Sequence, residues 1–315
     1  MIQTPNRTAL LEARKKIEKY IHKTPVFQSS ALNEISGAQL FFKAENMQKM
    51  GAFKMRGAMY ATLQLSKEQQ LKGIATHSSG NFAQAMALSA KLLKIPAWAI
   101  MPSNAPQVKK DAVASYGATI IECEPTLEAR ERTQEQVVNK HNCTPLHPYN
   151  AIDVILGNST ATQEFLEQTE SLDIIISPVG GGGLISGTAL ATHYFSPTTK
   201  VIGAEPQLAD DAYRSLKTGI IQPPLEPLTI ADGLRTALGD ITFHFIQQYV
   251  EEIKLASEAE IIDAMRLIWE RMKIVVEPSS AITLAIVLKN KDFFKGKKVG
   301  LILSGGNVDM GKLPF

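Results

Sequence analysis

Short apolar runs and helical stretches alternate along most of the chain. Apolar runs of strand length occur at residues 40–42, 73–76, 97–100, 118–121, 174–176, 201–203 and 299–303. Helical patterns occupy residues 8–21, 82–94, 107–115 and the Ala- and Leu-rich stretch after residue 183. Strands that alternate with helices favour parallel sheets covered by helices on both faces. The pattern therefore predicts the α/β fold class with open, twisted sheets.

Three of the predicted strands end in unusual polar or glycine-rich loops. These loops are Ser78–Asn81, Gly180–Gly183 and Ser304–Asn307. Ligands of parallel α/β sheets bind beyond the carboxyl ends of the strands. We therefore expect the three loops to converge on one site.

Composition narrows the classes of protein to consider. A chain of 315 residues has enough material for one large domain or two modest ones. A formal net charge of +2 gives no strong attraction to nucleic acid or membrane surfaces, and no apolar run is long enough to span a bilayer. The first residues lack a signal-peptide pattern, and two cysteines cannot form a disulfide framework. We expect a cytoplasmic protein without nucleic-acid or membrane partners.

The run Gly180–Gly183 lies between a predicted strand and a predicted helix. Successive backbone N–H groups at such a junction can bind one phosphate, and the helix dipole assists. A flexible turn is the simpler alternative. A dinucleotide site is another, because Glu205 ends the next strand, where a ribose-binding acid would lie. However, the required third glycine is replaced by Ile185 or Ser186, and no Gly-Lys-Ser/Thr sequence follows.

Lys54 is a candidate nucleophile because it lies between Phe53 and Met55. Partial burial would lower the pKa of its amine and allow attack on a carbonyl carbon. The alternative is an ordinary solvated lysine, and the local sequence alone favours that alternative.

Five motifs occur in a family-like order: Phe53–Ala58, Ser78–Asn81, Pro178–Gly183, Ala231–Gly233 and Ser304–Asn307. Together they resemble the serine racemase and serine/threonine dehydratase family of pyridoxal 5′-phosphate (PLP) enzymes, which have fold type II, like the tryptophan synthase β chain. The resemblance covers nearly the whole chain. It implies a large PLP-binding domain from 1–72 and 151–315, a small domain from 73–150, and a homodimer.

The resemblance implies a set of cofactor-binding residues: Phe53, Lys54, Asn81, Gly180, Gly181, Gly182, Gly183, Glu277 and Ser304. In this reading Lys54 carries PLP as a Schiff base and the glycines bind its phosphate. Asn81 would contact the ring hydroxyl and Ser304 the pyridine nitrogen. A neutral serine does not hold that nitrogen protonated, so the cofactor would be a weaker electron sink.

A second implied set binds the small amino-acid substrate: Ser78, Ser79, Gly80, Asn81 and Arg130. Lys54 would remove the α-proton, and Ser79 would be the acid/base on the opposite face. Dedicated threonine dehydratases often carry alanine in place of Ser79, so this residue favours the racemase-like branch, which includes hydroxyaspartate dehydratases. The simpler interpretation of Ser79 is a helix cap.

A divalent-cation site is also implied, with Glu205, the Ala209 carbonyl and Asp211 as ligands. Oxygen ligands suit Mg²⁺, Mn²⁺ or Ca²⁺ rather than zinc. The alternative is a strand-end turn in which a carboxylate caps the next helix.

The sequence thus predicts a PLP enzyme that racemises, or removes water from, a small hydroxy amino acid such as serine, threonine or 3-hydroxyaspartate. Two alternatives are a β-replacement enzyme resembling cysteine synthase and a nucleotide-binding protein without PLP. Several positions depart from the family pattern: Ala52, Phe82, Asn158, Ser159, Ser279 and Ser280. These departures concern substrate choice and nucleotide activation more than PLP binding.

Overall fold

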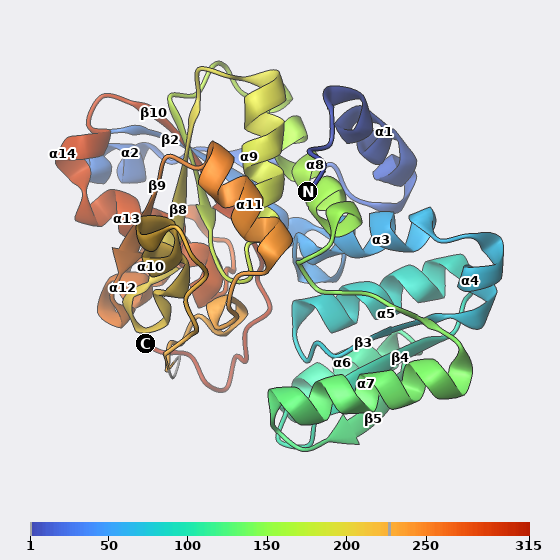
Figure 1. Ribbon diagram of the computed structural model, residues 1–315. Coiled ribbons are helices and arrows are strands. Elements are labelled where there is room, and N and C mark those ends of the chain that lie inside the picture. Colours follow the sequence, from blue (N-terminus) through green and yellow to red (C-terminus); the bar gives the residue numbers. More distant parts are fainter. Residues whose placement is uncertain (1, 226–227) are drawn as a thin grey trace.

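The computed structural model describes residues 2–225 and 228–315, whose strands form two separate sheets (Figure 1). The larger sheet has the order β1 (Val26–Phe27), β2 (Gln39–Ala44), β10 (Lys298–Leu303), β7 (Ile174–Pro178), β8 (Lys200–Pro206) and β9 (Glu252–Ala256). The smaller sheet has the order β5 (Thr119–Cys123), β4 (Ala97–Pro102), β3 (Ile74–Thr76) and β6 (Thr144–Pro145). All neighbouring strands are parallel except β1, which runs antiparallel to β2. The α/β class is confirmed.

Helices connect and cover the strands. The α-helices are α1 (Arg7–Ile17), α2 (Ser30–Ser36), α3 (Lys54–Gln64), α4 (Lys67–Lys72), α5 (Asn81–Leu93), α6 (Gln107–Ser115), α7 (Leu127–His141), α8 (Ile152–Gln168), α9 (Gly183–Phe195), α10 (Asp211–Thr218), α11 (Asp240–Tyr249), α12 (Glu258–Met272), α13 (Pro278–Lys289) and α14 (Lys291–Phe294). Short 3-10 helices are η1 (Glu18–Tyr20), η2 (Glu45–Met47), η3 (Lys49–Gly51), η4 (Gln207–Ala209) and η5 (Asp232–Leu234). In the described residues no helix is both long and apolar enough to cross a membrane.

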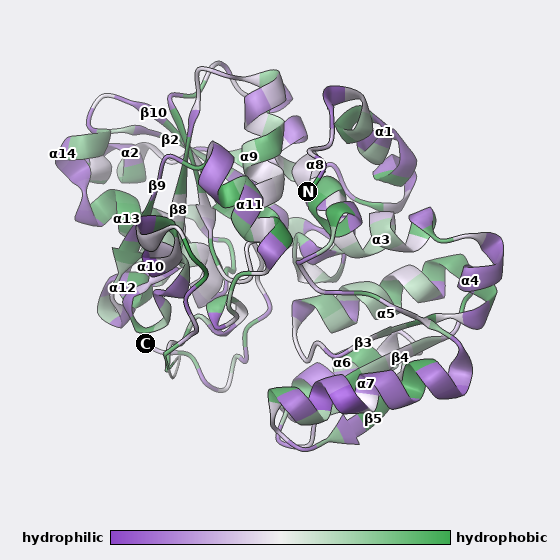
Figure 2. Cartoon of the chain, in the orientation of Figure 1, coloured by the Kyte–Doolittle hydropathy of each residue, from purple (hydrophilic) through white to green (hydrophobic). Residues whose placement is uncertain are grey.

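The large sheet is buried on both faces. Ile174 and Ile176 belong to one core cluster with apolar residues of α2, α12 and α13, whereas Ile175 belongs to another with Phe165 of α8 and Leu184 of α9. This alternation follows from the two-residue period of a strand. In Figure 2 the central strands of the large sheet are mostly hydrophobic, whereas the outer helix α7, which covers the small sheet, is mostly hydrophilic.

The small sheet packs against α5 on one face and α7 on the other. Its main core cluster contains the alanines of α5, and it also includes Ala58 and Ala61 of α3. Helix α3 therefore contributes to the core of the small sheet although it precedes residue 73. The proposed domain boundaries near 72 and 150 stay a prediction.

The predicted elements are all present, with shifted ends. The helix predicted at 8–21 ends at Ile17 and continues as the 3-10 turn η1. The strand predicted at 201–203 extends over Lys200–Pro206. Strands β1, β6 and β9 lacked an apolar run; β9 has the sequence Glu-Ile-Lys-Leu-Ala and forms an edge of the sheet.

A buried ionic network fixes the beginning of α3. The Arg56 guanidinium donates to both carboxylate oxygens of Glu45 (2.7 and 2.8 Å) and of Glu164 (both 2.8 Å). Lys43 donates to Glu164 at 2.9 Å, and Thr24 donates to Glu45 at 2.6 Å. Burial opposes the charge of Arg56, but the two glutamates outweigh it and raise its pKa. The positive charges of Arg56 and Lys43 therefore balance the negative charges of Glu45 and Glu164 in the core. Arg56 lies two residues after Lys54 in the chain.

Candidate active site

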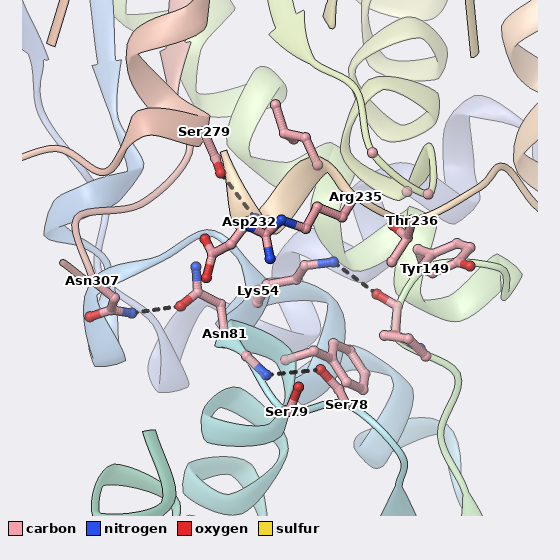
Figure 3. Close-up of a pocket in the computed structure, with 18 of the residues that line it drawn as sticks. Lys54, Ser78, Ser79, Asn81, Tyr149, Asp232, Arg235, Thr236, Ser279 and Asn307 are labelled. Atoms are coloured by element: carbon pink, nitrogen blue, oxygen red, sulfur yellow. Dashed lines mark hydrogen bonds between the residues drawn. The ribbon is translucent and has the colours of Figure 1, made fainter. Parts of the chain in front are cut away.

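The three strand-end loops meet at one cavity of about 710 Å³ between the two sheets. Its lining includes Lys54, Ser78–Phe82, Lys109, Arg130, Tyr149, Gly180–Leu184, Asp232–Thr236, Glu277, Ser279, Ser304 and Asn307. The convergence predicted from the carboxyl ends of parallel strands is thus found in the structure. Lys54 lies in the middle of Figure 3, with Ser78 and Ser79 on one side and Asp232 and Ser279 on the other.

Lys54 is the first residue of α3, and the loop after β10 fixes its position. The Phe53 N–H donates to the Ser304 carbonyl at 2.9 Å, and Ala52 forms a bridge with Gly305. The Lys54 amine donates to the Pro148 carbonyl at 3.0 Å. Burial lowers the pKa of this amine to about 8, although the charge of Glu277 acts in the opposite direction. Such a pKa makes the neutral, nucleophilic amine accessible near neutral pH.

The glycine loop leads into the N-terminus of α9. The N–H groups of Gly180, Gly181 and Gly182 donate to no acceptor among the described residues. Gly182 has a φ of +87°, which favours glycine. A Cβ atom at Gly181 would lie 2.4 Å from ring atoms of Tyr149, so a side chain there would collide with the opposite wall. Unpaired backbone donors at a helix N-terminus fit a phosphate group.

Asn81 links two of the loops. Its amide nitrogen lies 3.1 Å from each carboxylate oxygen of Glu277, and its oxygen accepts a 2.8 Å hydrogen bond from Asn307. Burial, followed by the charge of Asp232, raises the pKa of Glu277 to about 7. The amide of Asn81 is therefore held in one orientation at the cavity wall.

Ser304 is buried at the end of β10 and lines the cavity. Its hydroxyl lies 3.1 Å from that of Ser280, which in turn contacts the backbone of Gly305. The pair of hydroxyls positions Ser304 without placing a charge beside it.

The predicted substrate-side residues lie on the wall formed by the small sheet. Ser78, Ser79 and Gly80 precede α5, and the Gly80 N–H donates to the Ser78 hydroxyl at 3.4 Å. Arg130 lies on α7 and lines the same cavity; its Nε donates to the Thr126 carbonyl at 3.4 Å. The N-terminus of α5 can hold a carboxylate.

The predicted cation ligands lie apart from the cavity lining, at the end of β8. Both oxygens of Glu205 accept backbone N–H groups, from Ala212 at 2.8 Å and Tyr213 at 2.7 Å, so Glu205 also caps α10. Burial raises the pKa of Glu205 well above its usual value and that of Asp211 to about 6. Oδ2 of Asp211 is buried without a partner in the described residues. Within that same part of the chain, no cluster of three or more His, Cys, Asp or Glu side chains could hold a metal.

Several cavity residues were not identified from the sequence. Tyr149 packs against the glycine loop, and Lys109 forms an ion pair with Asp232 across the cavity. Arg235 extends into the cavity from the segment after η5 (Figure 3). The motif Ala231–Gly233 marked this region of the chain, but nothing local distinguished Arg235 from a solvated arginine.

Comparison with known proteins agrees with this geometry. The model of a family described as "Pyridoxal-phosphate dependent enzyme" matches residues 17–305. A β-hydroxyaspartate dehydratase from Paracoccus denitrificans is 50% identical over 311 residues, covering 99% of both chains. A serine racemase from Dictyostelium discoideum is 51% identical and covers 96% of this chain and 94% of its own. The structure of maize serine racemase aligns with a TM-score of 0.96 at 41% identity, covering 98% of this chain and 95% of that one.

Proposed function

Because the chain belongs to the pyridoxal-phosphate dependent enzymes, we propose that Lys54 is the residue to which the cofactor is attached. The enzyme catalyses racemisation, β-elimination or both on small hydroxy amino acids, the activities of its close relatives. The observation that supports the role of Lys54 is its partly buried amine, of pKa about 8, in the cavity lined by the glycine loop. The family membership leaves no reason to retain the nucleotide-binding alternative.

The residues present fit the cofactor. Gly180, Gly181 and Gly182 offer unpaired N–H groups to its phosphate, and the glycine at 183 begins the helix behind them. Ser304 offers a neutral hydroxyl for the ring nitrogen. Asn81, oriented by Glu277, would offer its amide to the ring hydroxyl, and Phe53 would pack beside the ring. When bound, the cofactor supplies an electron sink for charge that develops at the substrate α-carbon.

Two side chains, Lys54 and Ser79, then carry out the proton transfers on the two faces of the substrate. Lys54 takes the α-proton, and the N-terminus of α5, at Ser78–Asn81, holds the α-carboxylate. Ser79 lines the same cavity on the wall formed by the small sheet and acts as the second acid/base. A proton returned by Ser79 inverts the substrate, whereas loss of the β-hydroxyl leads to a keto acid and ammonia.

The test is to incubate purified, PLP-supplied protein separately with L-serine, D-serine, L-threonine and the 3-hydroxyaspartate isomers. Keto acid and the enantiomer of the remaining substrate are followed together. Lys54→Ala is expected to abolish both products and covalent cofactor retention. Ser79→Ala is expected to abolish inversion and to retain elimination. Turnover that survives Lys54→Ala would overturn the assignment of Lys54.

We also propose a divalent cation, Mg²⁺, Mn²⁺ or Ca²⁺, at Glu205, the Ala209 carbonyl and Asp211. The unpartnered, buried Oδ2 of Asp211 supports this site. A cation that binds there would raise the melting temperature of the wild type and have no effect on Asp211→Asn. Equal stabilisation of both proteins would show that the cation binds elsewhere.

Three further properties belong to the proposal. The large sheet draws its strands from before residue 45 and after residue 173, which supports a small domain inserted near 73–150. The free thiols of Cys123 and Cys143 support a reducing, cytoplasmic location. A homodimer follows from the family resemblance, and sedimentation of the purified protein would test it.

A further inference from the structure

Two guanidinium groups line the cavity without a carboxylate partner in the described parts of the chain. One is Arg130 on α7, which lies against the small sheet, and the other is Arg235, which follows η5 on the side of the large sheet. The hydrogen bonds of Arg130 and Arg235 within those parts go to the carbonyls of Thr126 and Thr229. Opposite walls of the same cavity therefore each present a positive charge.

Two hydrogen bonds hold the guanidinium group of Arg235 so that part of it points into the cavity. Its Nε and one terminal nitrogen both donate to the Thr229 carbonyl, at 3.0 and 2.6 Å. Thr229 is fully buried, so the accepting carbonyl belongs to the protein core although Arg235 itself is exposed. The second terminal nitrogen has no partner in the described residues, and Figure 3 shows the side chain extending toward the middle of the cavity. An anchored guanidinium loses little side-chain entropy when it binds an anion.

The acidic side chains of the lining do not neutralise these arginines. Asp232 forms an ion pair with Lys109. Glu277 is held by the Asn81 amide and by the Asn307 N–H at 3.3 Å. Arg235 is exposed and Arg130 is half-buried, so both guanidinium groups are open to an anionic ligand in the cavity, and such a ligand would complement their charge.

A monocarboxylic substrate offers only one carboxylate. The α-carboxylate of any amino acid is already bound at the N-terminus of α5 in the function proposed above, on which this inference rests. We propose that Arg235, opposite Arg130, binds a second carboxylate on the substrate side chain and so selects a hydroxylated amino diacid, 3-hydroxyaspartate, over serine and threonine. In the net reaction, 3-hydroxyaspartate loses water and then takes up water as the imine hydrolyses, giving oxaloacetate and ammonia.

The first test compares kcat/KM for the 3-hydroxyaspartate isomers and for L-serine in wild type and Arg235→Gln. Loss of a charge-assisted hydrogen bond predicts a decrease of about 10- to 100-fold for the diacid, mainly in KM. The serine value is expected to change little, because serine offers Arg235 no carboxylate. Arg235→Lys retains the positive charge but lacks the planar guanidinium group, so its kcat/KM for the diacid is expected to lie between those of the wild type and Arg235→Gln. Arg132→Gln, on α7 but outside the cavity lining, is the matched control and is expected to match the wild type.

The second test does not depend on turnover. Calorimetry of the PLP-loaded protein compares succinate, which has the four-carbon diacid skeleton, with butyrate, which has one carboxylate. Wild type is expected to bind succinate more tightly than butyrate, and Arg235→Gln is expected to lose that difference. Equal binding of the two acids, a wild-type preference for serine, or equal losses on both substrates would each overturn the inference. If no hydroxy amino acid reacts at all, the proposed function fails, and the succinate comparison still decides the role of Arg235.

Discussion

The side-chain nitrogen of Asn307 lies 2.8 Å from the side-chain oxygen of Asn81, although 226 residues separate them in the chain. The same nitrogen donates to the Met50 carbonyl at 2.9 Å. One side chain in the loop after β10 therefore holds both the beginning of α5 and the segment before Lys54. This contact joins the two sides of the cavity and sets the orientation of the Asn81 amide toward Glu277.

Removing this contact is expected to weaken the coupling between the two sides. Asn307→Ala should lower the free energy of unfolding of the cofactor-free protein by about 1–3 kcal/mol, because it leaves Asn81 and the Met50 carbonyl without their donor. Chemical denaturation measures the effect. A double-mutant cycle with Asn81→Ala should give a coupling energy of at least about 0.5 kcal/mol. Additive effects would contradict a direct interaction between the two side chains.

The lowered pKa of Lys54 predicts the pH dependence of cofactor capture. Only the neutral amine attacks the aldehyde, so the capture rate of cofactor-free protein should rise with pH and level off above about 8. A lysine with an ordinary pKa of about 10.4 would give a rate that still rises at pH 9. The absorbance of bound cofactor, followed from pH 6 to pH 10, measures the rate.

Lys54→Ala is the control for this measurement and should show no covalent capture at any pH. A midpoint near pH 10 for the wild type would mean that the cavity does not desolvate the amine.

The sequence was informative where function requires a fixed local pattern. Ser78, Gly180 and Ser304 were expected to line one site because parallel strands place their carboxyl ends on one edge of a sheet, and all three line the cavity. Lys54 was ambiguous, since its burial depends on Phe82 and Pro148, which lie elsewhere in the chain. The family motifs supplied what the local pattern could not.

Other features depend on tertiary contacts and leave no local trace. Arg235 looks like any arginine in a loop, and its anchor is a buried carbonyl six residues away. Tyr149 follows His147 and Pro148, and only the folded chain shows that its ring packs on Gly181. Strand β9 was missed because only Ile253 and Ala256 of this edge strand are fully buried, so its sequence carries no continuous apolar run.

The contact of Tyr149 with the glycine loop makes Gly181 sensitive to substitution. In Gly181→Ala the new methyl group would lie within 2.5 Å of ring atoms of Tyr149, so the loop or the ring must move. Overpacking of this kind costs about 1–3 kcal/mol of stability, and displacement of the N–H groups should also weaken PLP binding. Thermal unfolding and equilibrium PLP titration measure the two effects.

The double variant Gly181→Ala with Tyr149→Ala tests the cause, since removal of the ring makes room for the methyl group. In the Tyr149→Ala background, Gly181→Ala is expected to cost less stability than it does in the wild type. If the two substitutions act independently, the ring is not the obstacle.

The ionic network at Arg56 provides a direct comparison of buried and exposed ion pairs in one chain. Arg56→Met would leave Glu45 and Glu164 buried with only Lys43 to balance them, which should cost about 3–5 kcal/mol in the free energy of unfolding. Arg14 makes a similar two-bond contact with Glu167, but both side chains are partly exposed to solvent. Arg14→Met should therefore cost no more than about 1 kcal/mol.

Chemical denaturation of the two variants beside the wild type measures the difference. Because Arg56 lies two residues after Lys54, Arg56→Met should also reduce covalent PLP retention in protein that is still folded, whereas Arg14→Met should not. Similar losses of stability in both variants would mean that water reaches the Arg56 network. An intact cofactor site in a folded Arg56→Met protein would mean that the hydrogen bonds of Phe53 and Gly51 with the loop after β10 are sufficient to position Lys54.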